Sequence, residues 1–233
     1  MVKAILLDIE GTTTPIDFVH NTLFPYARAR MAGFVQQNLN DLKFEIAQLE
    51  KEREADSEYT GEFKPDAANS VSDYLVFLID NDRKSTPLKA IQGMIWQAGY
   101  ASGDLVSTVY PDVADALKKW KEEKRTVAIY SSGSVLAQQM IFKYSDQGDL
   151  TRYIDRYFDT NTGHKRESES YRKIAEELAL DASEIMFVSD VPEELDAAAD
   201  AGMKTLLMIR SGETGNMPDH GHKAATSFDG QEL

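Results

Sequence analysis

Near its amino terminus the chain reads Ala4-Ile5-Leu6-Leu7-Asp8-Ile9-Glu10-Gly11-Thr12, an apolar run followed by two carboxylates and a glycine. A short continuous apolar run is typical of a strand covered on both faces of a sheet. Asp8 is then the first side chain beyond the strand, where open α/β sheets carry out chemistry. A carboxylate there is able to attack phosphorus and form an aspartyl-phosphate. The alternative is an ordinary acidic turn, because short motifs match by chance.

The composition is that of a globular protein, with 233 residues, 42% hydrophobic and 27% charged. A net charge of −14 argues against a nucleic acid or an anionic membrane as partner, because the protein's average field repels both. The absence of cysteine excludes disulfides, thiolate metal sites and a cysteine nucleophile. We find neither a signal peptide nor an apolar run of roughly 18 residues, and we expect a cytoplasmic protein without a membrane partner.

Helical periodicity dominates residues 16–103. Apolar side chains alternate in steps of four and three, which makes one apolar stripe of Val35, Leu39, Leu42, Ile46 and Leu49. Two shorter stripes follow, at 71–78 and 88–95, and the polar residues 51–66 predict an exposed loop. We interpret residues 16–103 as a helical module inserted after the first strand.

Helix and strand patterns alternate from Pro111 onward. The predicted helices begin at Pro111 or span 134–143, 168–179 and 192–201, and the predicted strands are 126–130, 185–188 and 204–209. This alternation predicts an α/β fold, a Rossmann-like doubly wound parallel sheet with helices on both faces. Residues 1–15 and 104–233 would form this core, with 185–188 as its third strand. The tail from Ser211 carries no clear pattern.

Polar groups suited to a phosphate follow the later strands and loops. Ser131 and Ser132 precede a helix whose opening amides bind phosphoryl oxygens, although the same string is a common helix cap. Lys165 lies in a loop where a cation neutralises charge during phosphoryl transfer, although most lysines are solvated surface groups. Asp190 suits Mg²⁺, whereas the neighbouring acids 193–194 are equally suited to a helix dipole. Because the carboxyl ends of parallel strands meet, we expect one shared crevice.

The order Asp8-x-Glu10, Ser131, Lys165 and Asp190 resembles the four-motif signature of the haloacid dehalogenase superfamily, and the helical module resembles its cap domain. A closer resemblance, to the enolase-phosphatase family of methionine salvage, covers nearly the whole chain. Strings that carry it include DIEGTTTPIDFVH (8–20), IYSSGSV (129–135), FDTNTGHKRESESYRKIA (158–175) and SDVPEE (189–194). Glu10 is distinctive, since most phosphatases of the superfamily carry aspartate two residues after the nucleophile.

The resemblance implies an enzyme that acts on a small phosphorylated diketone, 2,3-diketo-5-methylthiopentyl-1-phosphate. The substrate is enolised and then dephosphorylated to the acireductone 1,2-dihydroxy-3-keto-5-methylthiopentene, through an enol-phosphate and an aspartyl-phosphate. The same resemblance implies one Mg²⁺ ion per subunit, and we expect a monomer.

The resemblance also implies a role for each motif residue. Asp8 resembles the nucleophile and a metal ligand, and Glu10 resembles an acid/base that also binds the metal through its carbonyl. Ser131 and Ser132 match phosphate binders, Lys165 matches the cation that bridges phosphate and nucleophile, and Asp190 matches the remaining metal ligand.

Several alternatives stay open. The base for enolisation is Glu10 or a cap residue such as Lys89, and the role of Glu194 is not assigned. A general cap-bearing phosphatase for sugar phosphates or nucleotides would share the core without the enolase step. A non-catalytic phosphate-binding module would share only the fold.

Overall fold

The computed structural model describes residues 1–210 and 221–231. Its contacts divide the chain into two compact units, Met1–Phe18 with Val106–Leu233, and Val19–Leu105. These boundaries lie two or three residues from those expected from the sequence, after residue 15 and before residue 104.

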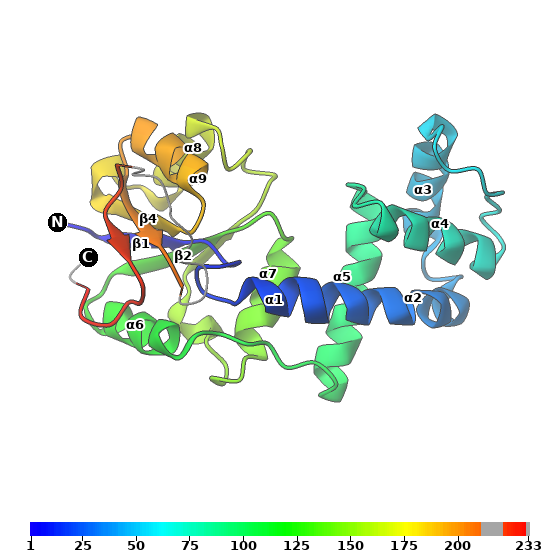
Figure 1. Ribbon diagram of the computed structural model, residues 1–233, viewed down its shortest axis with the longest axis horizontal. Helices are drawn as coiled ribbons and strands as arrows, with labels where there is room; N and C mark the ends of the chain where they lie inside the picture. Colours follow the sequence, from blue (N-terminus) through cyan, green and yellow to red (C-terminus); the bar gives the residue numbers. More distant parts are fainter. Residues whose placement is uncertain (211–220, 232–233) are drawn as a thin grey trace. The chain divides into compact units, whose positions relative to one another are not determined.

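Among the described residues, six parallel strands form the sheet of the first unit, in the order β3-β2-β1-β4-β5-β6 (Figure 1). They are β1 (Ala4–Leu7), β2 (Thr126–Tyr130), β3 (Arg156–Phe158), β4 (Ile185–Ser189), β5 (Lys204–Met208) and β6 (Ala224–Ala225). The predicted doubly wound parallel sheet is confirmed. The chain moves outward from β1 to β2 and β3, then returns to the other side of β1 for β4. The carboxyl ends of β1 and β4 therefore flank a topological switch point, where open α/β sheets bind ligands.

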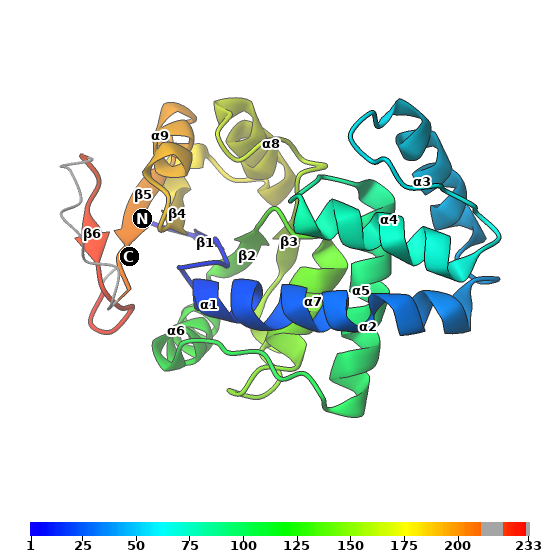
Figure 2. The same cartoon turned by 45° about the vertical axis from the view of Figure 1, so that its right-hand side comes forward.

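Helices cover both faces of this sheet (Figures 1 and 2). The helices α6 (Pro111–Glu122) and α7 (Val135–Lys143) lie on one face, and α8 (Ser168–Leu178) and α9 (Pro192–Asp200) lie on the other. The unit also contains the single turns α1 (Ile16–Phe18), η2 (Thr151–Tyr153) and η3 (Ala182–Glu184). All four residues of β1 are inaccessible to solvent, as expected for a strand between two helical layers.

Two strands of the sheet were not predicted from the sequence. β3 has three residues and β6 has two, and each is too short for a periodic pattern to distinguish it from a loop. Both lie at the edges of the sheet, so neighbouring strands define them on one side only. Because β3 precedes it, the strand at 185–189 is the fourth along the chain, not the third as predicted.

The second unit is helical. It contains the π-helical turn η1 (Val19–Leu23) and the helices α2 (Phe24–Asn38), α3 (Lys43–Ala55), α4 (Ala68–Asp80) and α5 (Thr86–Ser102). Its core is apolar and includes Met31, Val35, Leu49, Leu75 and Ile91, all fully buried. Among residues 1–210 and 221–231, no helix is both long and apolar enough to cross a bilayer.

The apolar stripe through residues 35–49 is divided between two helices. α2 ends at Asn38, whose backbone carbonyl accepts hydrogen bonds from the N–H groups of Asp41 and Leu42 and so closes a turn. The stripe survives in burial but belongs to two helices. The predicted loop 51–66 starts too early, because α3 continues to Ala55. Residues 51–55 are strong helix formers on an exposed helix end, where polarity does not indicate a loop.

Candidate active site

Asp8 is held at the end of β1 by a tight turn. Its backbone N–H donates to the Val188 carbonyl at 3.0 Å. The residue is buried, with 5% of its surface exposed. The turn needs Gly11, because its φ of +70° lies in the left-handed region. A Cβ at Gly11 would also collide with the Asp190 carboxylate. The acid that follows β4 therefore lies against the turn that follows β1.

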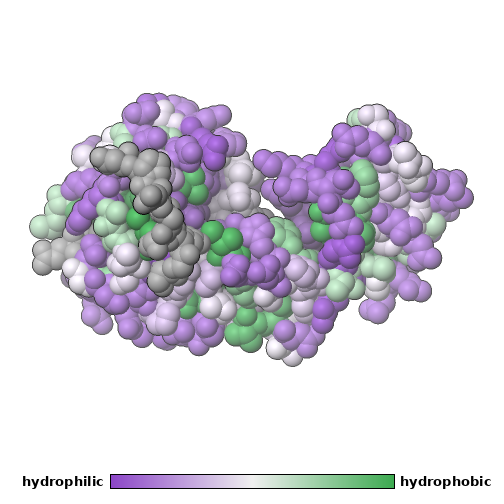
Figure 3. Space-filling view, in the orientation of Figure 1, coloured by the Kyte–Doolittle hydropathy of each residue, from purple (hydrophilic) through white to green (hydrophobic). Residues whose placement is uncertain are grey.

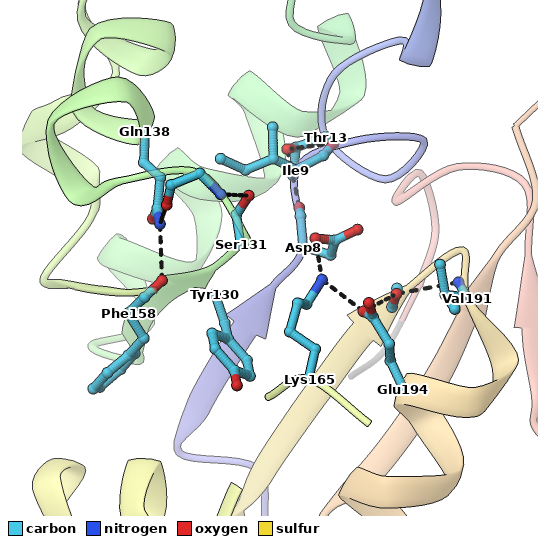
Figure 4. Close-up of polar contacts among 12 residues, drawn as sticks. Asp8, Ile9, Thr13, Tyr130, Ser131, Gln138, Phe158, Lys165, Val191 and Glu194 are labelled. Carbon is cyan, nitrogen blue, oxygen red and sulfur yellow. Dashed lines mark hydrogen bonds and ion pairs between the residues drawn. The ribbon is translucent and has the colours of Figure 1, made fainter. Parts of the chain in front are cut away.

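Lys165 joins two carboxylates (Figure 4). Its Nζ lies 2.5 Å from Asp8 Oδ1 and 2.6 Å from Glu194 Oε2, and the residue is 8% exposed. The Ser189 hydroxyl donates a further hydrogen bond to Glu194 Oε2, at 3.1 Å. Burial lowers the pKa of Lys165, but the two carboxylates outweigh it and the net shift is upward. Burial raises the pKa of Glu194, and Lys165 opposes that shift only in part. The lysine is therefore charged, and its charge is compensated.

Two buried tyrosines hold the loop that carries Lys165. The Tyr171 hydroxyl donates to the Lys165 carbonyl at 2.7 Å, and the Tyr130 hydroxyl donates to the Gly163 carbonyl at 2.9 Å. Burial raises the pKa of both tyrosines, so both hydroxyls keep the protons that they donate. Gly163 has a φ of +155°, and a Cβ there would collide with the Ser170 side chain. These two hydrogen bonds hold the backbone from which the Lys165 side chain extends.

The loop after β2 places Ser131 beside the same strand end. Ser131 is buried, and its Oγ accepts a hydrogen bond from the Gly133 N–H at 3.3 Å. Gln138, from α7, donates to the Gly133 and Phe158 carbonyls at 2.8 Å and so ties the loop to the end of β3. Ser132 is exposed. Of the two predicted phosphate binders, Ser131 has the fixed position.

Glu10 lies within the turn that Gly11 makes possible. It is half-buried, and an isolated β-bridge joins it to Thr14. The structure thus gathers Asp8, Lys165 and Glu194 into one buried cluster and places Glu10 two residues from it along the chain.

Three residues that support the site were not singled out in the sequence analysis. Tyr171 lies on the helix predicted at 168–179, three residues before Ile174, so a tyrosine on the apolar helix face was the available signal. Gln138 precedes Ile141 and Phe142 by three and four residues, so a polar side chain on the buried helix face was the available signal. Arg210 follows the apolar run 206–209, just as Asp8 follows β1, and this position at a strand end was its signal.

The oxygen groups at the site are of the chemical kind that Mg²⁺ prefers. Asp8, Asp190 and the Glu10 carbonyl offer hard oxygen donors, and Mg²⁺ in phosphate-processing enzymes typically uses one or two carboxylates, waters and substrate oxygens. In the part of the chain that the structure describes, no three His, Asp or Glu side chains gather as a metal site. A donor set of two carboxylates and a carbonyl needs no such group.

Comparison with known proteins identifies the class. Residues 2–202 match the family model for haloacid dehalogenase-like hydrolases, and the chain belongs to this family of enzymes. Two relatives named Enolase-phosphatase E1 are similar over nearly their whole length. That of Enterobacter sp. (strain 638) is 48% identical, with 94% of this chain and 93% of the relative covered. That of Leptospira borgpetersenii serovar Hardjo-bovis (strain JB197) is 47% identical, with 96% of both covered. Within the hydrolase family, the chain is therefore a member of the enolase-phosphatases, and the resemblance inferred from the sequence is confirmed.

A solved structure agrees with this placement. The UTR4 protein of Saccharomyces cerevisiae is 36% identical, with a TM-score of 0.82 over 99% of this chain and 100% of that one. Both units of the present chain thus have counterparts in that structure.

Proposed function

We propose that this protein is a bifunctional enolase-phosphatase of methionine salvage. It converts 2,3-diketo-5-methylthiopentyl-1-phosphate into the acireductone 1,2-dihydroxy-3-keto-5-methylthiopentene and phosphate. The observation that carries the proposal is the buried cluster of Asp8, Lys165 and Glu194 at the end of β1, in a member of this enzyme family.

Asp8 is the nucleophile of the phosphatase step. A carboxylate that approaches a phosphate dianion is repelled, and the Lys165 ammonium group, 2.5 Å from Asp8 Oδ1, reduces this repulsion. A bond forms between an Asp8 oxygen and phosphorus while the ester P–O bond breaks. The leaving enolate oxygen takes a proton from Glu10, which acts as the general acid.

Hydrolysis of the aspartyl-phosphate reverses the role of Glu10. Its carboxylate takes a proton from a water molecule as the water oxygen attacks phosphorus, and the bond to Asp8 breaks. The Ser131 hydroxyl accepts from the Gly133 N–H and retains its own proton for a phosphoryl oxygen. Amides at the start of α7 bind the other phosphoryl oxygens. Phosphate leaves, and the Asp8 carboxylate is restored.

One Mg²⁺ ion per subunit completes the proposal. Asp8, Asp190 and the Glu10 carbonyl would hold it, and the collision of a Gly11 Cβ with Asp190 supports a close approach of these donors. When bound, the ion supplies positive charge that stabilises the phosphoryl oxygens in the transition state.

Glu10 also serves the enolase step in this proposal. Enolisation removes a proton from the carbon that bears the phosphate ester. Glutamate is one methylene longer than the aspartate of most related phosphatases and so reaches this carbon as well as the ester oxygen. We expect Glu10→Asp to lose most of its enolisation rate. An unchanged rate would transfer the role of base to another residue, such as Lys89.

The function is tested by an anaerobic incubation with the diketo phosphate and Mg²⁺, in which the ultraviolet absorbance of the enol and the released phosphate are followed together. The parent enzyme should give both signals. Asp8→Asn should give enol without phosphate, since only the second step needs a nucleophile. Asp115→Asn, on the exposed surface of α6, is the matched control and should resemble the parent. If the parent releases phosphate from general esters but does not enolise the diketone, the protein is a general phosphatase instead.

Three further properties belong to this proposal. The helical residues 16–103 serve as the cap domain of the enzyme. The enzyme works in the cytoplasm, because a phosphate monoester does not cross a bilayer unaided. The protein is a monomer: on the face shown in Figure 3, hydrophilic side chains predominate on both units. Sedimentation equilibrium tests the last point, and a dimer mass would contradict it.

A further inference from the structure

A buried arginine just beyond the carboxyl end of β5 donates hydrogen bonds to the turn that follows Asp8. Arg210 is 4% exposed, and its Nε and Nη2 both donate to the Thr12 carbonyl, at 2.9 and 2.6 Å. Its Nη1 donates to Asp112 Oδ2 at 2.7 Å. The guanidinium carbon lies 4.2 Å from the centre of the Tyr110 ring. Hydrogen bonds and ring contact together fix the plane of the guanidinium group.

The turn itself leaves the Thr12 carbonyl for an outside donor. The N–H groups of Thr13 and Thr14 both donate to the Ile9 carbonyl at 2.9 Å, and the Gly11 N–H donates to the Thr14 carbonyl at 2.8 Å. Thr12 is fully buried, and a buried carbonyl requires a donor. Arg210 provides two donors to this carbonyl, both from outside the turn.

The charge of Arg210 is neutralised where it stands. Asp112, at the start of α6, has a side chain that is 10% exposed and also accepts the Phe228 N–H at 2.8 Å. The pair carries no net charge, so its effect on the reaction comes from geometry rather than from added positive potential.

We propose that Arg210 is a positioning residue for Glu10. Its two hydrogen bonds to the Thr12 carbonyl fix the turn, and the turn holds Glu10 at the leaving-group oxygen. This inference rests on the proposed function, in which Glu10 is the general acid. A side chain one residue from Gly11 and two from Thr12 moves with the turn, and displacement of a catalytic group by about 1 Å costs on the order of 100-fold in rate.

Displacement of Glu10 should affect some substrates more than others. An ester with a poor leaving group, such as an alkyl phosphate, needs the proton from Glu10, whereas a nitrophenyl phosphate needs little help because its leaving oxygen is already stable. Loss of the hydrogen bonds from Arg210 to Thr12 should therefore slow the hydrolysis of alkyl esters far more than that of nitrophenyl esters. A purely structural role would lower both rates equally, through the fraction of folded enzyme.

The test measures kcat/KM for phosphate monoesters that range from nitrophenyl to primary alkyl, since kcat/KM reports the steps up to departure of the leaving group. Arg210→Lys keeps the charge for Asp112 but loses the fork to Thr12. We expect about a 100-fold loss for the alkyl ester and about threefold or less for the nitrophenyl ester. Arg172→Lys, on the exposed face of α8, should match the parent with both esters.

Two further variants distinguish the effect of the hydrogen bonds to Thr12 from the effects of fold stability and of the Asp112 charge. Ile185→Val, fully buried at the start of β4 and away from Arg210, should lower the melting temperature without changing the dependence on leaving group. Asp112→Asn leaves the fork to Thr12 in place and should also leave that dependence unchanged, even if Arg210→Lys does not fold.

Two results would overturn the role of Arg210: an equal loss across all esters in folded Arg210→Lys, or a selective loss in Asp112→Asn. Failure of the proposed function is distinguishable. If the parent hydrolyses simple esters but does not enolise the diketo phosphate, the enolase assignment is wrong, while the ester series still decides whether Arg210 positions the general acid.

Discussion

Replacing Lys165 by methionine should destabilise the protein in a way that depends on pH. Methionine has a similar length and no charge, so the change leaves the Asp8 and Glu194 carboxylates together and without their shared cation. Removing one partner of a buried ion pair typically costs about 3–5 kcal/mol. We expect a loss of that size in the free energy of unfolding at pH 8.

The loss of unfolding free energy caused by Lys165→Met should become smaller as the pH falls. The pKa of Lys165 is raised, so the stability it provides is present throughout the range from pH 5 to 8 and is lost only above the ordinary lysine pKa. The pKa of Glu194 is already raised by burial, and removal of Lys165 raises it further. A carboxyl with a raised pKa destabilises the folded state as the pH rises. In the pH range where Glu194 is protonated in the folded variant but ionised in the parent and in both unfolded chains, the loss of unfolding free energy should fall by about 1.4 kcal/mol for each unit that the pH is lowered.

Urea unfolding of both proteins at pH 5, 6, 7 and 8, without divalent cations, measures this difference. Lys121→Met is the matched control, because Lys121 Nζ also lies 2.5 Å from a carboxylate, Asp155 Oδ1, but the lysine side chain is 42% exposed. Its loss should be about 0–1 kcal/mol and nearly constant with pH. Equal losses for the two variants would mean that distance, not burial, sets the cost. A Lys165→Met loss that does not change with pH would mean that Glu194 does not respond to the lysine.

Three further outcomes are expected. Gly11→Ala should weaken Mg²⁺ binding at least tenfold by isothermal titration, because its Cβ collides with the Asp190 carboxylate and its φ is positive; unchanged binding would separate Asp190 from the metal. Tyr171→Phe should destabilise the fold by about 1 kcal/mol and lower kcat more than it changes KM, since the Lys165 carbonyl loses its donor; steady-state kinetics with thermal unfolding measure both. A chelator should abolish phosphate release and added Mg²⁺ should restore it, whereas full release in the chelator would exclude a required ion.

Much of the fold was predictable from local patterns. The strand 126–130, the helix start at Pro111 and the helix from Ser168 were predicted within a residue of their observed bounds. These segments carry strong periodicity or a proline at a helix start. The stripe through residues 35–49 spans two helices because apolar spacing of three and four continues across the turn at Asn38. Burial determines the spacing of apolar residues, and two helices of one core share it.

The proposed reactive residues were predictable for a different reason. Asp8 and Asp190 each follow an apolar strand, and the order of strands in a parallel sheet brings such positions to one edge. The supporting residues were not. Glu194 was equally compatible with a helix dipole, and its role depends on Lys165, which lies 29 positions earlier in the chain and 2.6 Å away in space.

The amino-acid sequence alone determined the class of fold, the chemistry of the reactive groups and the family, because strand periodicity and motif residues are local properties of the chain. Only the tertiary structure decided which groups touch. Lys165 pairs with both Asp8 and Glu194, and Arg210 donates hydrogen bonds to Thr12. Each of these contacts joins residues from separate strands and loops. Contacts of this kind depend on how the sheet and its helices pack, and no spacing along the chain records that packing.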